Sequence, residues 1–147
     1  NPKLDISDRS LCSIMQTSTV KGTTTRGMLS YFEPDKWTIE SNFTNKTPQT
    51  DGEFKSFVVS HLKNNMPILV ENIDWGGHWR VIMGYDDLGT PAIADDVLIL
   101  ADPYDTTDHY QDGYGIEPAQ RFYYMWFDAK LFPKDQQNRQ WISVKPK

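Results

Sequence analysis

The sequence has one cysteine, three histidines and no long apolar run in its 147 residues. Its single cysteine, Cys12, excludes an intramolecular disulfide framework and a structural zinc site built from several thiolates. No apolar stretch approaches the roughly 20 residues that a helix needs to span a bilayer, so we expect no membrane partner. The formal net charge of -5 argues against a nucleic-acid-binding surface. None of these features indicates a compartment.

The composition is that of a folded globular protein. Hydrophobic residues make up 38% of the chain and charged residues 24%, which separates it from disordered proteins. The length suits one domain, residues 1–147, and is short for two. Aromatic residues are frequent, and the segment 121–132, "RFYYMWFDAKLF", holds six of them. We expect these rings to form a thick core or a wall that faces a ligand.

Apolar residues at helical spacing predict three helices in the first half of the chain, at 7–18, in a short segment that ends at Pro34, and at 53–64. Cys12 lies beside the core-facing positions of the first helix, without a setting that would lower the pKa of a nucleophilic thiol. We therefore interpret it as a packed core residue.

Apolar runs and alternating patterns predict strands at 36–42, 67–73, 78–86, 96–102, 121–129 and 140–145. Helices come early and strands come late, without the alternation that is typical of a parallel sheet. This order predicts an α+β domain in which N-terminal helices pack on a mostly antiparallel sheet.

A histidine and an aspartate stand where a hairpin would bring them together. His78 follows Gly77, whose missing side chain lets another group approach the backbone closely. Asp102 ends an apolar strand and precedes Pro103. If the two strands fold back near Thr90, residues 78 and 102 meet at one edge of the sheet. We expect a hydrogen bond between the imidazole and the carboxylate, as a general base requires.

Each residue around His78 also has a purely structural interpretation. His78 itself is either a catalytic base or a polar residue whose hydrogen bonds are satisfied at a strand end. Trp75 and Trp79 either line a substrate groove or pack within the fold. Arg80 shares a face with His78, and we favour a solvated charge there over a group that binds a substrate carboxylate.

The loop after Asp102 is rich in oxygen-bearing side chains. Asp105, Asp108 and Asp112 resemble calcium ligands in type, but their spacing lacks the pattern of an EF-hand. We therefore favour a long loop shaped by Asx turns, and expect neither a metal nor a cofactor. Tyr104 lies two residues after Asp102 in this loop, and we expect its side chain to border a substrate cleft.

The segments "GGHWRVIMGYD" and "DVLILADPYD" resemble the histidine and aspartate blocks of papain-like cysteine peptidases, closest to the C39-like branch. This resemblance implies a papain-like fold in which His78 is the general base and Asp102 orients it. It also implies a nucleophilic cysteine, and a glutamine before it, that would precede Asn1. The chain is then expected to be the C-terminal portion of such a domain, with an N-terminal segment and a peptide or protein substrate as partners.

Three functions follow as hypotheses. The first is the histidine- and aspartate-bearing portion of a cysteine peptidase, with Trp75, Gly77, Trp79 and Tyr104 near the substrate. The second is a non-catalytic peptide-binding domain of the same fold that has lost its nucleophile. The third is a metal-dependent hydrolase-like domain built around Asp105, Asp108 and Asp112.

Overall fold

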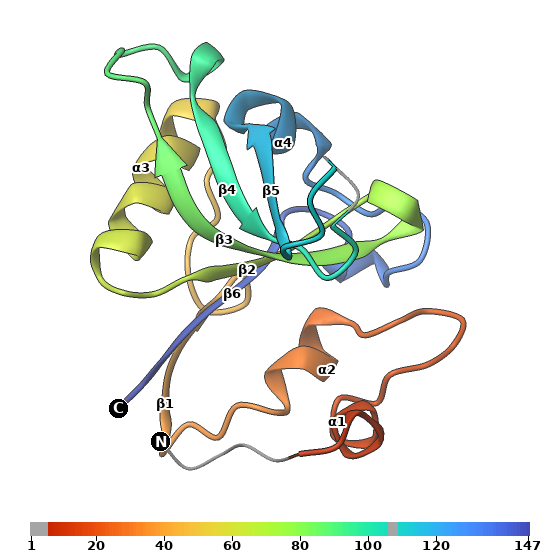
Figure 1. Cartoon of the computed structure of the whole chain (residues 1–147). Helices are drawn as coiled ribbons and strands as arrows, with labels where there is room; N and C mark the ends of the chain where they lie inside the picture. Colours follow the sequence, from red (N-terminus) through yellow and green to blue (C-terminus); the bar gives the residue numbers. More distant parts are fainter. Residues whose placement is uncertain (1–5, 106–108) are drawn as a thin grey trace.

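The computed structural model describes residues 6–105 and 109–147 (Figure 1). The α-helices of this part are α1 (Asp8–Ile14), α2 (Thr25–Leu29), α3 (Asp51–Lys63) and α4 (Ala119–Met125). Its strands are β1 (Trp37–Ser41), β2 (Ile68–Asn72), β3 (His78–Asp86), β4 (Val97–Ala101), β5 (Tyr114–Pro118) and β6 (Gln140–Pro146). Single turns of 3-10 helix lie at Asp74–Gly76, Ile93–Asp95 and Lys134–Gln136. None of the helices described is both long enough and apolar enough to cross a membrane.

The strands described form one sheet in the order β1-β6-β2-β3-β4-β5. Each neighbouring pair is antiparallel. Five of the predicted strands correspond to β1, β2, β3, β4 and β6, with ends that differ by at most one residue. The predicted α+β class with an antiparallel sheet is therefore confirmed.

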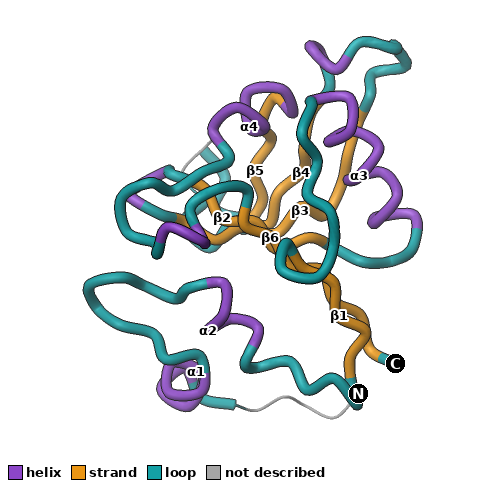
Figure 2. The backbone as a smooth tube through the Cα atoms, turned by 180° about the vertical axis from the view of Figure 1, so that it is seen from behind, coloured by secondary structure: helices purple, strands orange, loops and turns teal. Residues whose placement is uncertain are grey.

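Helices α3 and α4 lie together on one side of the β3–β5 part of the sheet (Figures 1 and 2). Thr50 caps α3, because its hydroxyl accepts a hydrogen bond from the Glu53 N–H. Phe54 and Val58 are four residues apart on this helix and are fully buried. The main core contains these two side chains together with Ile68, Val70, Ile82, Leu98, Leu100, Ala119, Phe122, Tyr123, Trp126 and Trp141.

The segment that carries α1 and α2 lies on the other side of β2 and β6 (Figures 1 and 2). Polar contacts attach it there: the Thr25 hydroxyl donates to Gln140 Oε1 at 2.6 Å, and the Trp79 Nε1–H donates to the Thr23 carbonyl at 2.8 Å. No residue of α1 itself is buried. The prediction that Cys12 is a packed core residue is wrong, because this thiol is exposed.

The predicted strand at 121–129 is also wrong, because most of this segment belongs to the helix α4. A continuous apolar run does not distinguish a buried strand from a buried helix by its period. Phe122 and Trp126 are four residues apart, and both pack against Phe54 of α3, with ring centroids 5.9 and 5.5 Å away. Packing between the two helices therefore decides the local structure.

The strand β5 was not predicted. Its buried positions are Gly115 and Glu117, while its apolar residues Tyr114 and Ile116 are exposed. A buried glycine and a buried acid reverse the usual pattern of a half-buried strand, so no apolar alternation marks this segment.

The hairpin between β3 and β4 has a different register from the one expected. A fold at Thr90 would pair Ile82 with Leu98, but Ile82 pairs with Leu100, and a β-bulge follows before Gly84. Continued beyond the last pair, this register places Asp102 opposite Arg80 and diagonal to His78. The aspartate lies just past the end of β4, where its side chain can still reach the first residue of β3.

Candidate functional site

His78 and Asp102 are in direct contact, as the hairpin argument predicted. His78 Nε2 lies 2.7 Å from Asp102 Oδ1, and each residue is 7% exposed. A carboxylate can only accept, so the proton of this bond belongs to Nε2. Neutral His78 then has an unprotonated Nδ1, which has no hydrogen-bond partner among the residues described. This nitrogen is the atom that can accept a proton from another group.

Asp102 is fixed at the start of its loop by two backbone contacts. Its Oδ1 also accepts the Tyr104 N–H at 2.8 Å in an Asx turn, and its own N–H donates to the Gly113 carbonyl at 2.9 Å. Burial would raise the pKa of Asp102, but the hydrogen bonds from His78 and Tyr104 and the charge of Arg80 outweigh it. The pKa therefore lies below its ordinary value, and the carboxylate is ionised at neutral pH.

Arg80 is buried beneath this pair, with 4% of its surface exposed. Its Nη1 lies 2.9 Å from Glu117 Oε2 and 4.0 Å from Asp102 Oδ2. Its Nη2 lies 3.1 Å from Asp74 Oδ2. The expectation of a solvated charge is wrong: Arg80 connects Asp102 to acids on β5 and before β3, and it balances their buried charge.

Tyr104 and Gly77 are next to the histidine. The Tyr104 ring centroid is 5.2 Å from that of His78, and this tyrosine is 63% exposed, so it lies between the imidazole and solvent. Gly77 directly precedes His78 and has a φ of +115°, which favours glycine. Its N–H donates to the Asp74 carbonyl at 3.0 Å.

Trp79 is not brought together with His78 by the contacts described. Trp79 follows His78 on β3 and therefore points to the opposite face of the sheet. Its ring lies 6.4 Å from that of Phe132, and its indole N–H bonds the segment before α2. The side chain of Trp75 lies outside the described residues.

The aspartates of the following loop bond the backbone. Asp105 Oδ2 accepts the Gly113 N–H at 2.7 Å, and Asp112 Oδ1 accepts the Tyr114 N–H at 3.0 Å. The second contact is an Asx turn of the kind predicted. Asp108 lies outside the described residues. Among the residues described, no three histidine, cysteine or acidic side chains gather as metal ligands would.

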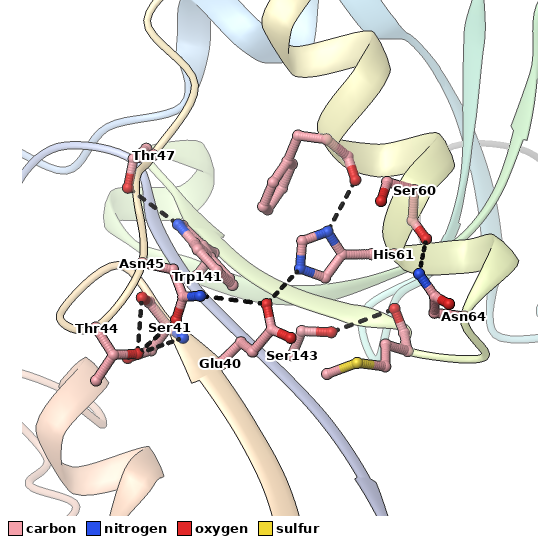
Figure 3. A network of polar contacts seen from close by, with 12 residues as sticks. Glu40, Ser41, Thr44, Asn45, Thr47, Ser60, His61, Asn64, Trp141 and Ser143 are labelled. Carbon is pink, nitrogen blue, oxygen red and sulfur yellow. Dashed lines mark hydrogen bonds and ion pairs between the residues drawn. The ribbon is translucent and has the colours of Figure 1, made fainter.

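His61 occupies a separate polar network on α3 (Figure 3). Its Nδ1 donates to the Phe57 carbonyl at 2.8 Å, and its Nε2 lies 3.4 Å from Glu40 Oε2. The ring also packs edge-on against Trp141, with centroids 5.4 Å apart. Both nitrogens therefore face groups of the fold, in contrast to His78.

A family model described as "Peptidase_C39 like family" matches residues 11–129. The chain belongs to this Peptidase_C39 like family. Comparison with curated proteins and with solved structures finds no match. Membership supports a peptidase-related function at the level of the family, and the α+β papain-like fold expected from the sequence is confirmed.

The matched range of this Peptidase_C39 like chain includes buried acids that the sequence argument missed. Glu71 lies on β2 and Asp128 follows α4, and both are fully buried. One signal was available: Glu71 interrupts the apolar segment "PILVENI", and a charged residue within a buried strand needs a partner. The sequence does not identify that partner, because Asp128 is far away along the chain.

Proposed function

We propose that this chain supplies the general base and the orienting acid of a cysteine peptidase, and that the nucleophilic cysteine precedes residue 1. His78 is the base and Asp102 the acid. One observation carries the proposal: His78 Nε2 bonds Asp102 at 2.7 Å, while Nδ1 has no partner among the residues described. A buried imidazole that is oriented through one nitrogen can exchange a proton through the other.

The reaction is peptide-bond hydrolysis in two steps. His78 Nδ1 takes the thiol proton, and the thiolate attacks the peptide carbonyl carbon to form a tetrahedral intermediate. As the C–N bond breaks, the imidazolium returns this proton to the leaving amine, which leaves a thioester. His78 then accepts a proton from water, the hydroxide attacks the thioester, and the thiol is regenerated. Asp102 stabilises the imidazolium during both steps because it stays ionised.

The substrate would approach from the side of the imidazole where Tyr104 lies. This tyrosine is largely exposed and packs beside His78, which suits contact with a bound peptide. Gly77, which directly precedes His78, is assigned to the substrate side with Tyr104, whereas Trp79 points to the opposite face of the sheet and has no substrate role in this proposal. The other partner is the upstream segment that carries the cysteine.

The test is alkylation of the full-length gene product by iodoacetamide at pH 6, with mass spectrometry to locate each modified thiol. A thiolate that is stabilised by an imidazolium reacts at this pH, whereas an ordinary thiol is almost fully protonated. We expect one cysteine upstream of residue 1 to react about 10- to 100-fold faster than the exposed Cys12. His78→Ala should remove this difference, and His109→Gln is the matched control that should not.

Equal rates at all cysteines, or an unchanged pattern in the His78→Ala variant, would overturn the proposal. Equal rates at all cysteines, together with a chain that binds peptides and does not cleave them, would favour the non-catalytic peptide-binding domain instead. Cys12 reports general thiol accessibility in every sample, so a change in folding is distinguished from a change at the active site.

A further inference from the structure

Two fully buried carboxyl groups lie behind the start of β3. Glu71 comes from β2 and Asp128 from the segment after α4, and each has an exposed fraction of 0%. Asp128 Oδ1 accepts the N–H groups of Lys130 and Leu131 at 2.8 and 3.1 Å. No protein donor among the residues described reaches Asp128 Oδ2 or either oxygen of Glu71.

The unsatisfied oxygens converge on Gly77. A Cβ atom at this position would lie 2.7 Å from Asp128 Oδ2 and 3.3 Å from Glu71 Oε1. Gly77 therefore packs with its bare α-carbon against both carboxyl groups, and its φ of +115° adds a second reason for glycine here. Because His78 is the next residue, this contact helps to fix the position of the His78 backbone and therefore of its imidazole.

Two carboxylates cannot both remain ionised at such a site without a counter-charge. Glu71 pairs with Trp79 on β3 and with Gln140 on β6, and neither carries a charge. The charged group that acts on Glu71 is Asp128, whose effect is repulsive. A protonated carboxyl group, however, has an O–H that can donate to its neighbour, as in carboxyl pairs that share one proton.

We propose that Glu71 and Asp128 share one proton, with Glu71 as the donor and Asp128 as the anion, and that this pair positions Gly77 and therefore His78. Asp128 is the anion because two backbone N–H groups already stabilise its charge. Burial and the charge of Asp128 raise the pKa of Glu71 to about 9, so the proton is retained at neutral pH.

The proposal has a consequence for stability. In the unfolded chain Glu71 ionises at its ordinary pKa of about 4.5, so between that pH and about 9 the folded state binds one more proton. The folding equilibrium constant therefore falls with rising pH, by about tenfold per pH unit from this group alone. Glu71→Gln keeps a donor for Asp128 and removes the titrating proton, so this pH dependence should disappear.

The experiment compares urea unfolding of the full chain and of its Glu71→Gln variant between pH 6 and pH 8. We expect the ratio of their folding constants to change about 100-fold over this range in favour of the variant. Glu33→Gln is the control, since this glutamate is exposed and paired with Lys36 on the surface. If Glu71→Gln does not fold, Asp128→Asn tests the same point, because its amide can donate to an ionised Glu71.

A second measurement tests the positioning role by NMR. The Gly77 amide and the His78 ring should shift with a midpoint near pH 9 in the parent chain and in Glu33→Gln, but not in Glu71→Gln. A ratio of folding constants that is independent of pH would overturn the shared proton. So would loss of the pH dependence on adding millimolar Ca²⁺ or Mg²⁺ at constant ionic strength, because a cation would then balance the carboxylates.

The role toward His78 rests on the proposed function, but the shared proton does not. If the NMR signal of the Gly77 amide shifts with a midpoint near pH 9 and His78→Ala leaves thiol reactivity unchanged, only the peptidase proposal fails. If thiol reactivity depends on His78 and the signal of the Gly77 amide does not change with pH, only the proposal of a shared proton fails. The two results are therefore distinguishable.

Discussion

Replacing Arg80 with methionine removes the cation that lies among three acids and keeps most of the side-chain volume. Arg80 is 4% exposed, and its nitrogens lie 2.9 Å from Glu117, 3.1 Å from Asp74 and 4.0 Å from Asp102. With an effective dielectric constant of about 20, Coulomb's law gives about 6 kcal/mol for the shortest contact and about 4 kcal/mol for the longest. The desolvation of the buried guanidinium offsets much of this attraction.

We expect the Arg80→Met variant to lose about 3–5 kcal/mol of unfolding free energy, because Asp102 stays buried without this counter-charge and Glu117 keeps only the partly exposed Arg121, at 2.6 Å. Such a loss is a large part of the about 5–15 kcal/mol that stabilises a typical domain. Urea unfolding at pH 7, followed by tryptophan fluorescence, measures it.

A double-mutant cycle separates the charge from the packing. The Arg80→Met/Glu117→Gln variant should be about 1–3 kcal/mol more stable than the sum of the two single changes predicts, because the second change removes a buried charge that has lost one of its two arginine partners. A loss below about 1 kcal/mol in Arg80→Met, or a cycle without coupling, would refute the idea that this network balances the charge of Asp102.

Three further predictions concern the same end of the sheet. Asp102→Asn should lower the unfolding free energy, measured by urea titration, by about 2 kcal/mol at pH 7. This difference should shrink below about pH 4, because the folded state has a lowered Asp102 pKa and the stability that it supplies is lost as the pH falls through that pKa. Gly77→Ala should cost about 3 kcal/mol or more by thermal unfolding, since its Cβ would lie 2.7 Å from a carboxyl oxygen, whereas Gly89→Ala, with a φ of +71° in open space, should cost about 1 kcal/mol. Trp79→Phe removes the bond to the Thr23 carbonyl and should cost about 1 kcal/mol, with faster proteolysis before α2; unchanged proteolysis would contradict that anchoring role.

Local sequence patterns predicted much of the sheet and the central pair of the site. Alternating or continuous apolar residues between turn signals identify β2, β3, β4 and β6, because these strands bury apolar side chains at regular positions. The contact between His78 and Asp102 followed from simple hairpin geometry. It survived an error in the register, because Asp102 lies beyond the last paired residue and its side chain reaches diagonally.

Other features depend on contacts between segments that are distant in sequence. The aromatic run at 121–129 became the helix α4 because Phe122 and Trp126 pack against Phe54. Cys12 was expected in a core, but no residue of α1 is buried in the described structure. An amphipathic pattern shows which side of a helix is apolar, and it does not show whether another element covers that side.

The sequence by itself determined the antiparallel α+β class and the position of a histidine at the start of one strand, because both follow from patterns within a few neighbouring residues. Only the tertiary structure decided which charges lie together: Arg80 among its acids, and Glu71 beside Asp128 behind Gly77. Ionic and proton-sharing partners act over a few ångströms in space, and their spacing along the chain carries no period that a sequence pattern could reveal.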